Sequence, residues 1–159
     1  MQAIEVDRVP GGVAQNYTFG LLWDGRVIFN DSAVLTGVWD PAYWRLTPDV
    51  ATIAAEFGTT LLGHSSGIYL GTASGNIYRS TNGGGTWTLI ATPSAGNAVR
   101  SIAAYVDSAT DPSLWVVIDN AGTPELLPLT YSGSYATGAA ITVGAVTYTH
   151  LTLPTICSV

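Results

Sequence analysis

A glycine-rich segment near the middle of the chain reads Ser80-Thr81-Asn82-Gly83-Gly84-Gly85-Thr86-Trp87. The Asn82 side chain can accept a hydrogen bond from a backbone amide two residues on, and the three glycines adopt positive φ without steric cost. We therefore expect a fixed turn here, with Thr86 beginning a strand. The Trp87 ring is expected to fold beneath the turn, where it buries apolar area and donates its indole N–H to a backbone carbonyl.

The sequence around this turn is repetitive. Residues 50–57 match residues 99–106 at an offset of 49, and Ile68-Tyr69-Leu70 matches Leu114-Trp115-Val116. Upstream, Gly20-Leu21-Leu22 corresponds to Leu70-Gly71-Thr72. A repeat of this length, filled with short apolar runs and glycine-rich turns, is typical of the four-stranded blade of a β-propeller. Helical repeats would need longer amphipathic segments, which the chain does not show.

We predict an all-β fold of antiparallel four-stranded blades, forming a partial β-propeller of about three blades within residues 1–147. The blades span roughly 13–49, 50–98 and 99–147. In the second blade we predict strands at 52–57, 68–72, 76–80 and 86–91, with turns at 58–67, 73–75 and 81–85. In the third blade we predict strands at 101–106, 114–118, 125–130 and 140–147, with turns at 107–112, 119–122 and 132–138. An alternative for residues 49–56 is a short capped helix.

The end of the chain differs from the rest. Residues 148–159 resemble a tail that recurs on unrelated reading frames predicted from environmental DNA, and we expect them to be translated adapter sequence rather than native protein. The alternative is a last strand at 151–156, broken by Pro154. Without the tail the chain has no cysteine, so cysteine usage does not indicate a redox compartment. Because three blades leave two exposed sheet edges, we expect a fragment that needs missing blades or self-association to close the ring.

Residues 80–87 fit the pattern Ser-x-Asp-x-Gly-x-Thr-Trp, with Asn82 in the aspartate position. The segment resembles the Asp-box, or BNR repeat, of sialidases, other glycoside hydrolases, sortilin-type receptors and photosystem assembly factors. The resemblance implies that the turn joins the third and fourth strands of a blade and lies away from the catalytic face. The box residues are therefore expected to be structural; they are Ser80, Asn82, Gly84, Thr86 and Trp87. Phosphate binding by the glycines is disfavoured, because neither a lysine nor a helix pattern follows them.

One short element points to an enzyme. Arg8-Val9-Pro10 resembles the Arg-Ile-Pro element of sialidases, in which the arginine is one of three that bind a substrate carboxylate. The resemblance makes Arg8 a candidate catalytic residue. The other two arginines and the tyrosine nucleophile with its glutamate partner would lie in blades outside this chain. We favour the competing interpretation that Arg8 is a solvated loop residue before Pro10-Gly11-Gly12.

The remaining candidate residues each allow two interpretations. Acidic residues before or between turn formers could act as acid and base or bind calcium, but their neighbours favour turns; they are Asp24, Asp31, Asp40 and Asp49. His64 has no cysteine or second histidine near it, so we expect a turn histidine and no metal site. A group of aromatic residues could stack on a sugar, although packing between blades is favoured; they are Trp23, Trp39, Tyr43 and Trp44. No cofactor is expected.

The charge pattern excludes several partners. A net charge of -6, with five arginines scattered singly and no lysine, cannot neutralise a nucleic-acid backbone. No apolar run is long enough for a membrane span, and no export signal is visible at the N-terminus. We expect a non-catalytic Asp-box propeller module that acts as a binding or scaffold domain for carbohydrate or protein, in an extracytoplasmic or virion-surface location. The alternatives are the amino-terminal part of a sialidase-like glycoside hydrolase and a virion tail or fibre component.

Overall fold

The described part of the chain is all-β, as predicted. The computed structural model describes residues 7–11, 15–22, 24–30, 44–46, 56–106 and 111–142, and no helix occurs in these ranges. The predicted boundary between the first and second blades at 49–50 lies outside the described residues, as do all but the last residue of the alternative helix at 49–56 and the predicted adapter tail at 148–159. The short apolar runs therefore form strands, and glycine-containing segments between them form turns, as the backbone preferences of these residues lead us to expect.

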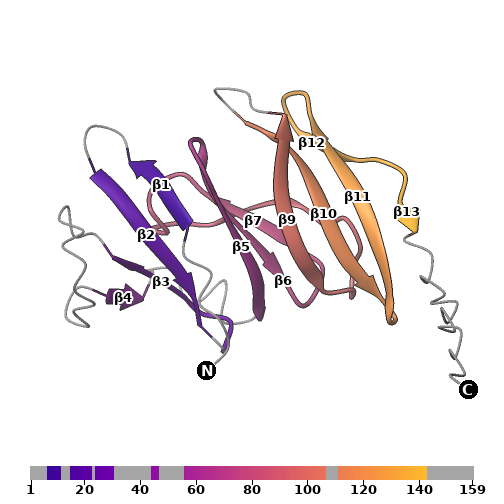
Figure 1. Cartoon of the computed structure of the whole chain (residues 1–159), viewed down its shortest axis with the longest axis horizontal. Coiled ribbons are helices and arrows are strands. Elements are labelled where there is room, and N and C mark those ends of the chain that lie inside the picture. Colours follow the sequence, from indigo (N-terminus) through magenta and orange to yellow (C-terminus); the bar gives the residue numbers. More distant parts are fainter. Residues whose placement is uncertain are drawn as a thin grey trace, which may run out of the picture.

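Three antiparallel sheets follow one another along the chain (Figure 1). Sheet 1 contains β1 (Asp7–Gly11), β2 (Gln15–Leu21), β3 (Val27–Asn30) and β4 (Trp44–Leu46). Sheet 2 contains β5 (Gly58–His64), β6 (Gly67–Thr72), β7 (Ile77–Ser80) and β8 (Thr88–Ala91). Sheet 3 contains β9 (Val99–Val106), β10 (Ser113–Asn120), β11 (Thr123–Tyr131), β12 (Tyr135–Thr137) and β13 (Ile141–Thr142).

The strands pair in chain order within each sheet, so that the connections join neighbouring strands, except that β12 and β13 do not pair with each other. In sheet 3 the fourth place is shared, because β12 and then β13 pair with successive parts of β11. None of the three sheets closes on itself over the described strands. Each sheet is therefore an open meander, which needs neighbours on its faces to bury its apolar side chains.

Two of the predicted turns are wrong. The sequence predicts a turn at 58–67, but 58–64 form β5 and only the short segment before Gly67 turns. The glycines and serines of this segment favour a turn, whereas Thr59-Thr60-Leu61-Leu62 between them has the β-branched and apolar side chains of a half-buried strand. In sheet 3 the predicted turn at 132–138 contains β12. β13 lies within the strand predicted at 140–147, whose residues 143–147 fall outside the described part of the chain.

Sheet 2 lies between the other two sheets and buries both of its faces. One face meets sheet 1 in a cluster that includes Phe19, Leu61 and Leu70. The other face meets sheet 3 in a cluster that includes Tyr69 and Val116. Alternate residues of β6 point to opposite faces, and all six residues of that strand are buried. A strand buried on both faces is the expected result when a sheet is stacked between two others.

Sheets 2 and 3 approach closely where Gly71 lies against Val99. A Cβ atom on Gly71 would stand 2.5 Å from Val99 Cγ1 and 2.7 Å from Thr60 Cγ2, so no larger residue fits there without movement. The Thr59 hydroxyl lies at the same contact, bonded to the carbonyl of Gly71 at 3.1 Å and to the carbonyl of Val99. The two sheets are thus joined by packing and by a polar bridge.

The first strands of the sheets lie next to one another. β5 contacts β1 of the preceding sheet and β9 of the following sheet, and the three are seen side by side in Figure 1. Each sheet therefore begins on the same side of the molecule, and its later strands extend away from that side.

Candidate functional site

The turn between β7 and β8 is held by the side chains of Ser80 and Asn82. Asn82 Oδ1 accepts hydrogen bonds from the Ser80 hydroxyl at 3.0 Å and from the Thr86 amide at 2.9 Å. Asn82 Nδ2 donates to Thr86 Oγ1 at 3.0 Å, and the Gly84 amide donates to Ser80 Oγ at 2.8 Å. Two short side chains thus satisfy two backbone amides that a turn would otherwise leave to solvent.

The hydrogen bond that Asn82 accepts from the backbone covers a longer sequence separation than predicted. We predicted that Asn82 accepts an amide two residues on, whereas the amide that it accepts belongs to Thr86, four residues on. Gly83 and Gly84 have φ of 68° and 81°, a left-handed backbone that brings Thr86 back over Asn82. Glycine adopts this conformation without the steric cost that a Cβ atom brings.

Trp87 follows the turn and lies in the apolar cluster between sheets 1 and 2. Its side chain is 7% exposed and packs in the same cluster as Phe19, Leu61 and Tyr78. The predicted hydrogen bond of the indole is wrong for the described part of the chain, because Nε1 is buried without a partner there. The ring therefore contributes through its apolar area, and its N–H is desolvated at a cost.

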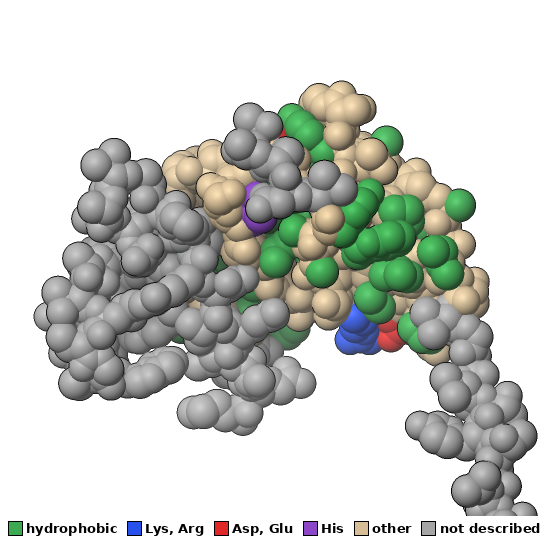
Figure 2. Space-filling view, turned by 45° about the horizontal axis from the view of Figure 1, so that its top comes forward, with side chains coloured by type: hydrophobic (Ala, Val, Ile, Leu, Met, Phe, Trp, Pro, Cys, Tyr) green, Lys and Arg blue, Asp and Glu red, His purple; other side chains and the backbone are tan. Residues whose placement is uncertain are grey.

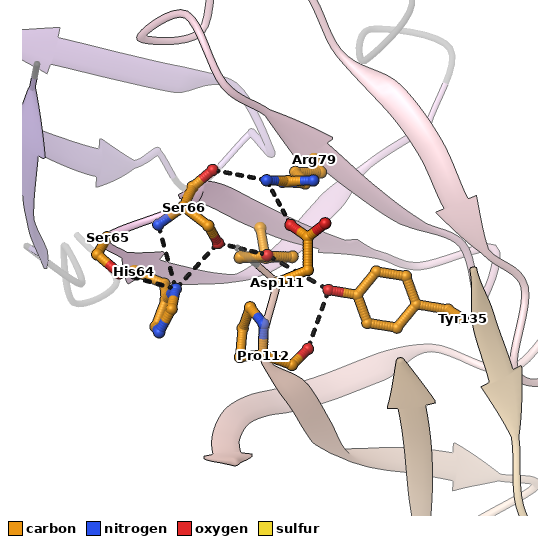
Figure 3. A network of polar contacts seen from close by, with 8 residues as sticks. His64, Ser65, Ser66, Arg79, Asp111, Pro112 and Tyr135 are labelled. Atoms are coloured by element: carbon orange, nitrogen blue, oxygen red, sulfur yellow. Dashed lines mark hydrogen bonds and ion pairs between the residues drawn. The ribbon is translucent and has the colours of Figure 1, made fainter. Parts of the chain in front are cut away.

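A second polar group lies at the same end of sheet 2 as this turn. The hairpin from β5 to β6 approaches the end of β7 so closely that a Cβ atom on Gly67 would stand 2.3 Å from the Ser80 carbonyl oxygen. In the hairpin, His64 Nδ1 accepts the Ser66 amide at 3.2 Å and lies 2.9 Å from Ser66 Oγ (Figure 3). His64 is thus the last residue of β5 and not a turn residue as predicted, although its imidazole bonds to the turn that follows. The described residues contain no cluster of three or more metal-ligating side chains.

The hairpin is linked to sheet 3 through tyrosine hydroxyls. Ser66 Oγ lies 2.9 Å from the hydroxyl of Tyr69, which in turn accepts a bond from the Tyr135 hydroxyl at 3.3 Å. The Tyr135 hydroxyl also lies 3.0 Å from the carbonyl oxygen of Pro112, as Figure 3 shows. Burial and the bond to Tyr69 raise the pKa of Tyr135 above its usual range. The phenol therefore stays protonated and serves as a hydrogen-bond donor.

Arg79 of β7 joins the same group from the side. Its guanidinium donates to the Ser66 carbonyl at 2.8 Å, forms an ion pair with Asp111 at 2.5 Å and lies 5.8 Å from the centre of the Tyr69 ring. The side chains of Arg79 and Asp111 are 20% and 10% exposed, so the pair is largely removed from water. A hydrogen bond to Asp111 also raises the pKa of Tyr131. The pair connects two sheets and a hairpin at one point.

The chemistry of this group is that of a structural junction. Ser66 and His64 are a hydroxyl and an imidazole within hydrogen-bond distance, the pairing that a nucleophile and its base would need. However, the same Nδ1 atom already accepts the Ser66 amide, and Asp111, which could orient a base, is bound by Arg79 and Tyr131. These contacts hold sheets 2 and 3 together, and they do not align a nucleophile, a base and an orienting carboxylate.

A third polar group lies at the opposite end of sheet 2 and is built on Glu56. Its carboxylate accepts four hydrogen bonds, from Asn76 Nδ2 and the Tyr78 hydroxyl at 2.7 Å each, from Ser74 Oγ at 2.8 Å and from Thr72 Oγ1 at 3.0 Å. Burial raises the pKa of Glu56, but these bonds outweigh it and hold the pKa below its ordinary value. Burial and the bond to Glu56 raise the pKa of Tyr78 to about 12.

The structure places the other predicted residues as follows. Arg8 lies within β1, paired with Thr18 of β2, and not in a loop as we had favoured. Asp24 lies in the turn between β2 and β3, where it forms an ion pair with Arg26 at 2.6 Å, and the bond from Arg26 lowers its pKa. Trp44 begins β4. The remaining candidates lie outside the described residues; they are Trp23, Asp31, Trp39, Asp40, Tyr43 and Asp49.

Comparison with known proteins identifies no relative of this chain. Searches against family models, curated proteins and solved structures find no match to this chain. Among the described residues there is also no helix of the length and apolar character that crossing a membrane requires. The features of the chain that bear on its function are therefore its geometry and its sequence motif.

Proposed function

We propose that this chain is part of an Asp-box β-propeller that serves as a non-catalytic binding or scaffold module. The observation that carries the proposal is the turn at 81–87. It joins the third and fourth strands of a four-stranded meander, and its hydrogen bonds use Ser80, Asn82, Gly84 and Thr86, the positions that the motif specifies. A short motif by itself is weak support for a family assignment. The support is stronger when the motif lies on the strand connection that the family uses.

The arrangement of the sheets supports the propeller. Three meanders of neighbouring strands stack face against face, and their first strands adjoin one another. A propeller is built in this way, with the first strand of each blade nearest the central axis. The three sheets would then be three successive blades.

The state of the polar groups supports a module without catalysis of its own. At the Asp-box end of sheet 2, His64, Arg79 and Asp111 are engaged in the junction with sheet 3. At the other end, where the resemblance puts the face that binds ligands, Glu56 is held by four donors. A carboxylate saturated in this way stabilises a rim on which a ligand or partner can rest, and it is a poor acid at neutral pH.

One observation favours a second candidate, a sialidase-like glycoside hydrolase. Arg8 lies on β1, the first strand of sheet 1, and β1 contacts β5. In a propeller this strand would border the axis, which is where an arginine that binds a substrate carboxylate would be needed. The two candidates share the fold and differ only in what the site does.

A binding assay separates them, because the nucleophile and two further arginines of a sialidase would lie outside this chain, and the chain alone would then release no product under either candidate. The purified chain and an Arg8→Ala variant are titrated calorimetrically with N-acetylneuraminic acid and, as a control, with its methyl ester, which lacks the carboxylate. We expect the unaltered chain to bind neither sugar more tightly than Arg8→Ala does. Binding of the free acid that weakens at least about tenfold in Arg8→Ala and is absent for the ester would overturn this expectation and favour the second candidate.

A further inference from the structure

The turn between β7 and β8 contains an asparagine that is followed directly by a glycine. This is Asn82, and every other asparagine of the sequence precedes a residue with a side chain; these are Asn16, Asn30, Asn76, Asn97 and Asn120. The carboxamide of an asparagine can react with the backbone nitrogen of the next residue and lose ammonia. A glycine at the next position hinders this reaction least, because it has no Cβ atom. The sequence therefore favours the reaction at Asn82.

The nitrogen of Gly83, which would be the nucleophile, is not engaged by the fold. A Cβ atom on Gly83 would meet nothing within 4 Å, and none of the described residues accepts a hydrogen bond from the Gly83 amide. The side chain of Asn82 is itself exposed. Water and hydroxide can therefore reach the amide proton that must leave before the nitrogen attacks.

The carboxamide of Asn82, by contrast, is fixed by three hydrogen bonds. Oδ1 accepts the Ser80 hydroxyl at 3.0 Å and the Thr86 amide at 2.9 Å, and Nδ2 donates to Thr86 Oγ1 at 3.0 Å. The carboxamide also lies against Gly85, where a Cβ atom would stand 3.1 Å from Nδ2. Attack draws Cγ onto the Gly83 nitrogen and expels Nδ2, so the carboxamide must first leave Thr86.

We propose that Asn82 is a deamidation site that the folded turn protects, so that the reaction proceeds when the turn opens. In the opened turn the Gly83 nitrogen loses its proton to hydroxide and attacks Asn82 Cγ. The bond from Cγ to Nδ2 then breaks, and Nδ2 takes a proton from water and leaves as ammonia. The product of this step is a cyclic imide. The imide forms without any change in oxidation state.

Water opens the imide in one of two ways. Cleavage of the new bond from Cγ to the Gly83 nitrogen gives aspartate, and cleavage of the original peptide bond between residues 82 and 83 gives isoaspartate. An aspartate still accepts the Ser80 hydroxyl and the Thr86 amide, and the Thr86 hydroxyl can rotate to donate to its second oxygen. Isoaspartate adds a methylene group to the main chain and displaces the acceptor. The turn therefore re-forms around aspartate and not around isoaspartate.

The two donors to Asn82 Oδ1 also have an opposing effect. Hydrogen bonds to a carbonyl oxygen stabilise the negative charge that develops there during attack. This stabilisation accelerates the reaction only if the Gly83 nitrogen reaches Cγ while the bonds are intact. Because attack expels the nitrogen that Thr86 Oγ1 holds, we expect protection to outweigh acceleration. The proposal depends neither on closure of a propeller nor on the absence of catalysis.

The rate of deamidation at neutral pH tests the proposal in the full chain and in a peptide of residues 76–90, which lacks the packing of the sheets. Few charged side chains lie on the described surface that Figure 2 shows, and the whole chain has 5 basic and 11 acidic residues. One added carboxylate therefore separates the product by anion exchange, and tandem mass spectrometry locates it. We expect Asn82 to react at least about tenfold more slowly in the chain than in the peptide.

Two variants of the full chain identify the cause of the protection. Thr86→Ala removes the acceptor of Nδ2 and should raise the rate at least about threefold. Thr81→Ala is the matched control, because Thr81 adjoins Asn82 but makes none of the three bonds, and its rate should stay within about twofold of the unaltered chain. Circular dichroism checks that both variants are folded. The aspartate product should match Asn82→Asp in retention and in its urea midpoint, and the isoaspartate product should unfold at lower urea.

Three results would overturn the proposal. If Asn82 stays intact in the peptide, it is not a deamidation site. If the chain reacts as fast as the peptide, the turn gives no protection, and if it reacts faster, the donors to Oδ1 promote the attack. Equal acceleration in Thr86→Ala and Thr81→Ala would show that the hydrogen bonds of the carboxamide do not control the reaction.

Discussion

Asn82 and Thr86 are joined by two hydrogen bonds that run in opposite directions across the turn between β7 and β8. The Thr86 amide donates to Asn82 Oδ1 at 2.9 Å, and Asn82 Nδ2 donates to Thr86 Oγ1 at 3.0 Å. The same Oδ1 accepts the hydroxyl of Ser80. One side chain therefore fixes both ends of the turn and the start of the strand that carries Trp87.

Removing this side chain should destabilise the chain. We expect Asn82→Ala to lower the free energy of unfolding by about 1–3 kcal/mol, because the Thr86 amide loses its acceptor. Asn82→Asp keeps the accepting oxygen and should stay within about 0.5 kcal/mol of the unaltered chain. Urea denaturation of the three proteins measures the difference, and equal losses in both variants would show that the accepting oxygen does not hold the turn.

Trp87 should contribute through apolar area and not through its N–H. Because the ring is 7% exposed, we expect Trp87→Ala to cost about 3–5 kcal/mol. Trp87→Phe removes an N–H that has no partner among the described residues, so it should cost at most about half as much. Thermal or urea unfolding gives both values. A Phe variant as unstable as the Ala variant would point to a hydrogen bond of the indole.

Two of the three described arginine ion pairs should differ in how much they stabilise the fold. Arg79→Ala leaves Asp111 largely buried without its cation, and we expect a loss of about 3 kcal/mol. Arg100→Ala is the matched control, since Arg100 and Asp119 are 58% and 31% exposed, and the loss there should be only a small fraction of the loss in Arg79→Ala. Denaturation at low and high salt measures both. Similar losses in the two variants would contradict the role of Arg79 in joining sheets 2 and 3.

The polar group built on Glu56, which includes Tyr78, should make the free energy of unfolding fall at both extremes of pH. Because the folded state lowers the pKa of Glu56 below 4.5, its contribution is present above that pH and is lost as the pH falls through the folded value. Because the folded state raises the pKa of Tyr78 from 10.0 to about 12, its contribution is present below pH 10.0 and is lost as the pH rises towards about 12.

Melting temperatures measured as a function of pH test the expected loss of stability on the acid limb and on the alkaline limb of the curve. Glu56→Gln should flatten the acid limb relative to the unaltered chain, and Tyr78→Phe should flatten the alkaline limb. An acid limb that is unchanged in Glu56→Gln would mean that other carboxylates, such as Asp24 and Asp119, account for it; bonds with Arg26 and Arg100 lower their pKa values.

The sequence predicts best the strands that glycine turns delimit. The strands predicted at 68–72 and 114–118 coincide with β6 and the centre of β10, because each apolar run ends at a glycine-containing turn. The prediction from sequence fails at 58–67, where the strand itself contains glycine. There the apolar and β-branched side chains between the glycines outweigh the turn signal, since they pack against both neighbouring sheets.

The polar groups are harder to predict. The donors to Glu56 lie 16 to 22 residues away in the chain, and Arg79 meets Asp111 only because sheets 2 and 3 stack. No local pattern marks either contact, because the partners are brought together by the strand order. The turn at 81–87 is predictable for the opposite reason: its partners all lie within seven residues of one another.

The stacking of repeated sheets is tested most directly by nuclear Overhauser spectra of the methyl-labelled chain. We predict cross-peaks between the Gly71 α-protons and the Val99 methyl groups, which join sheets 2 and 3, and between the Gly25 α-protons and the Phe57 ring, which join the turn of sheet 1 to the start of sheet 2. Spectra that contain the cross-strand peaks within each sheet but lack both of these contacts would contradict the account.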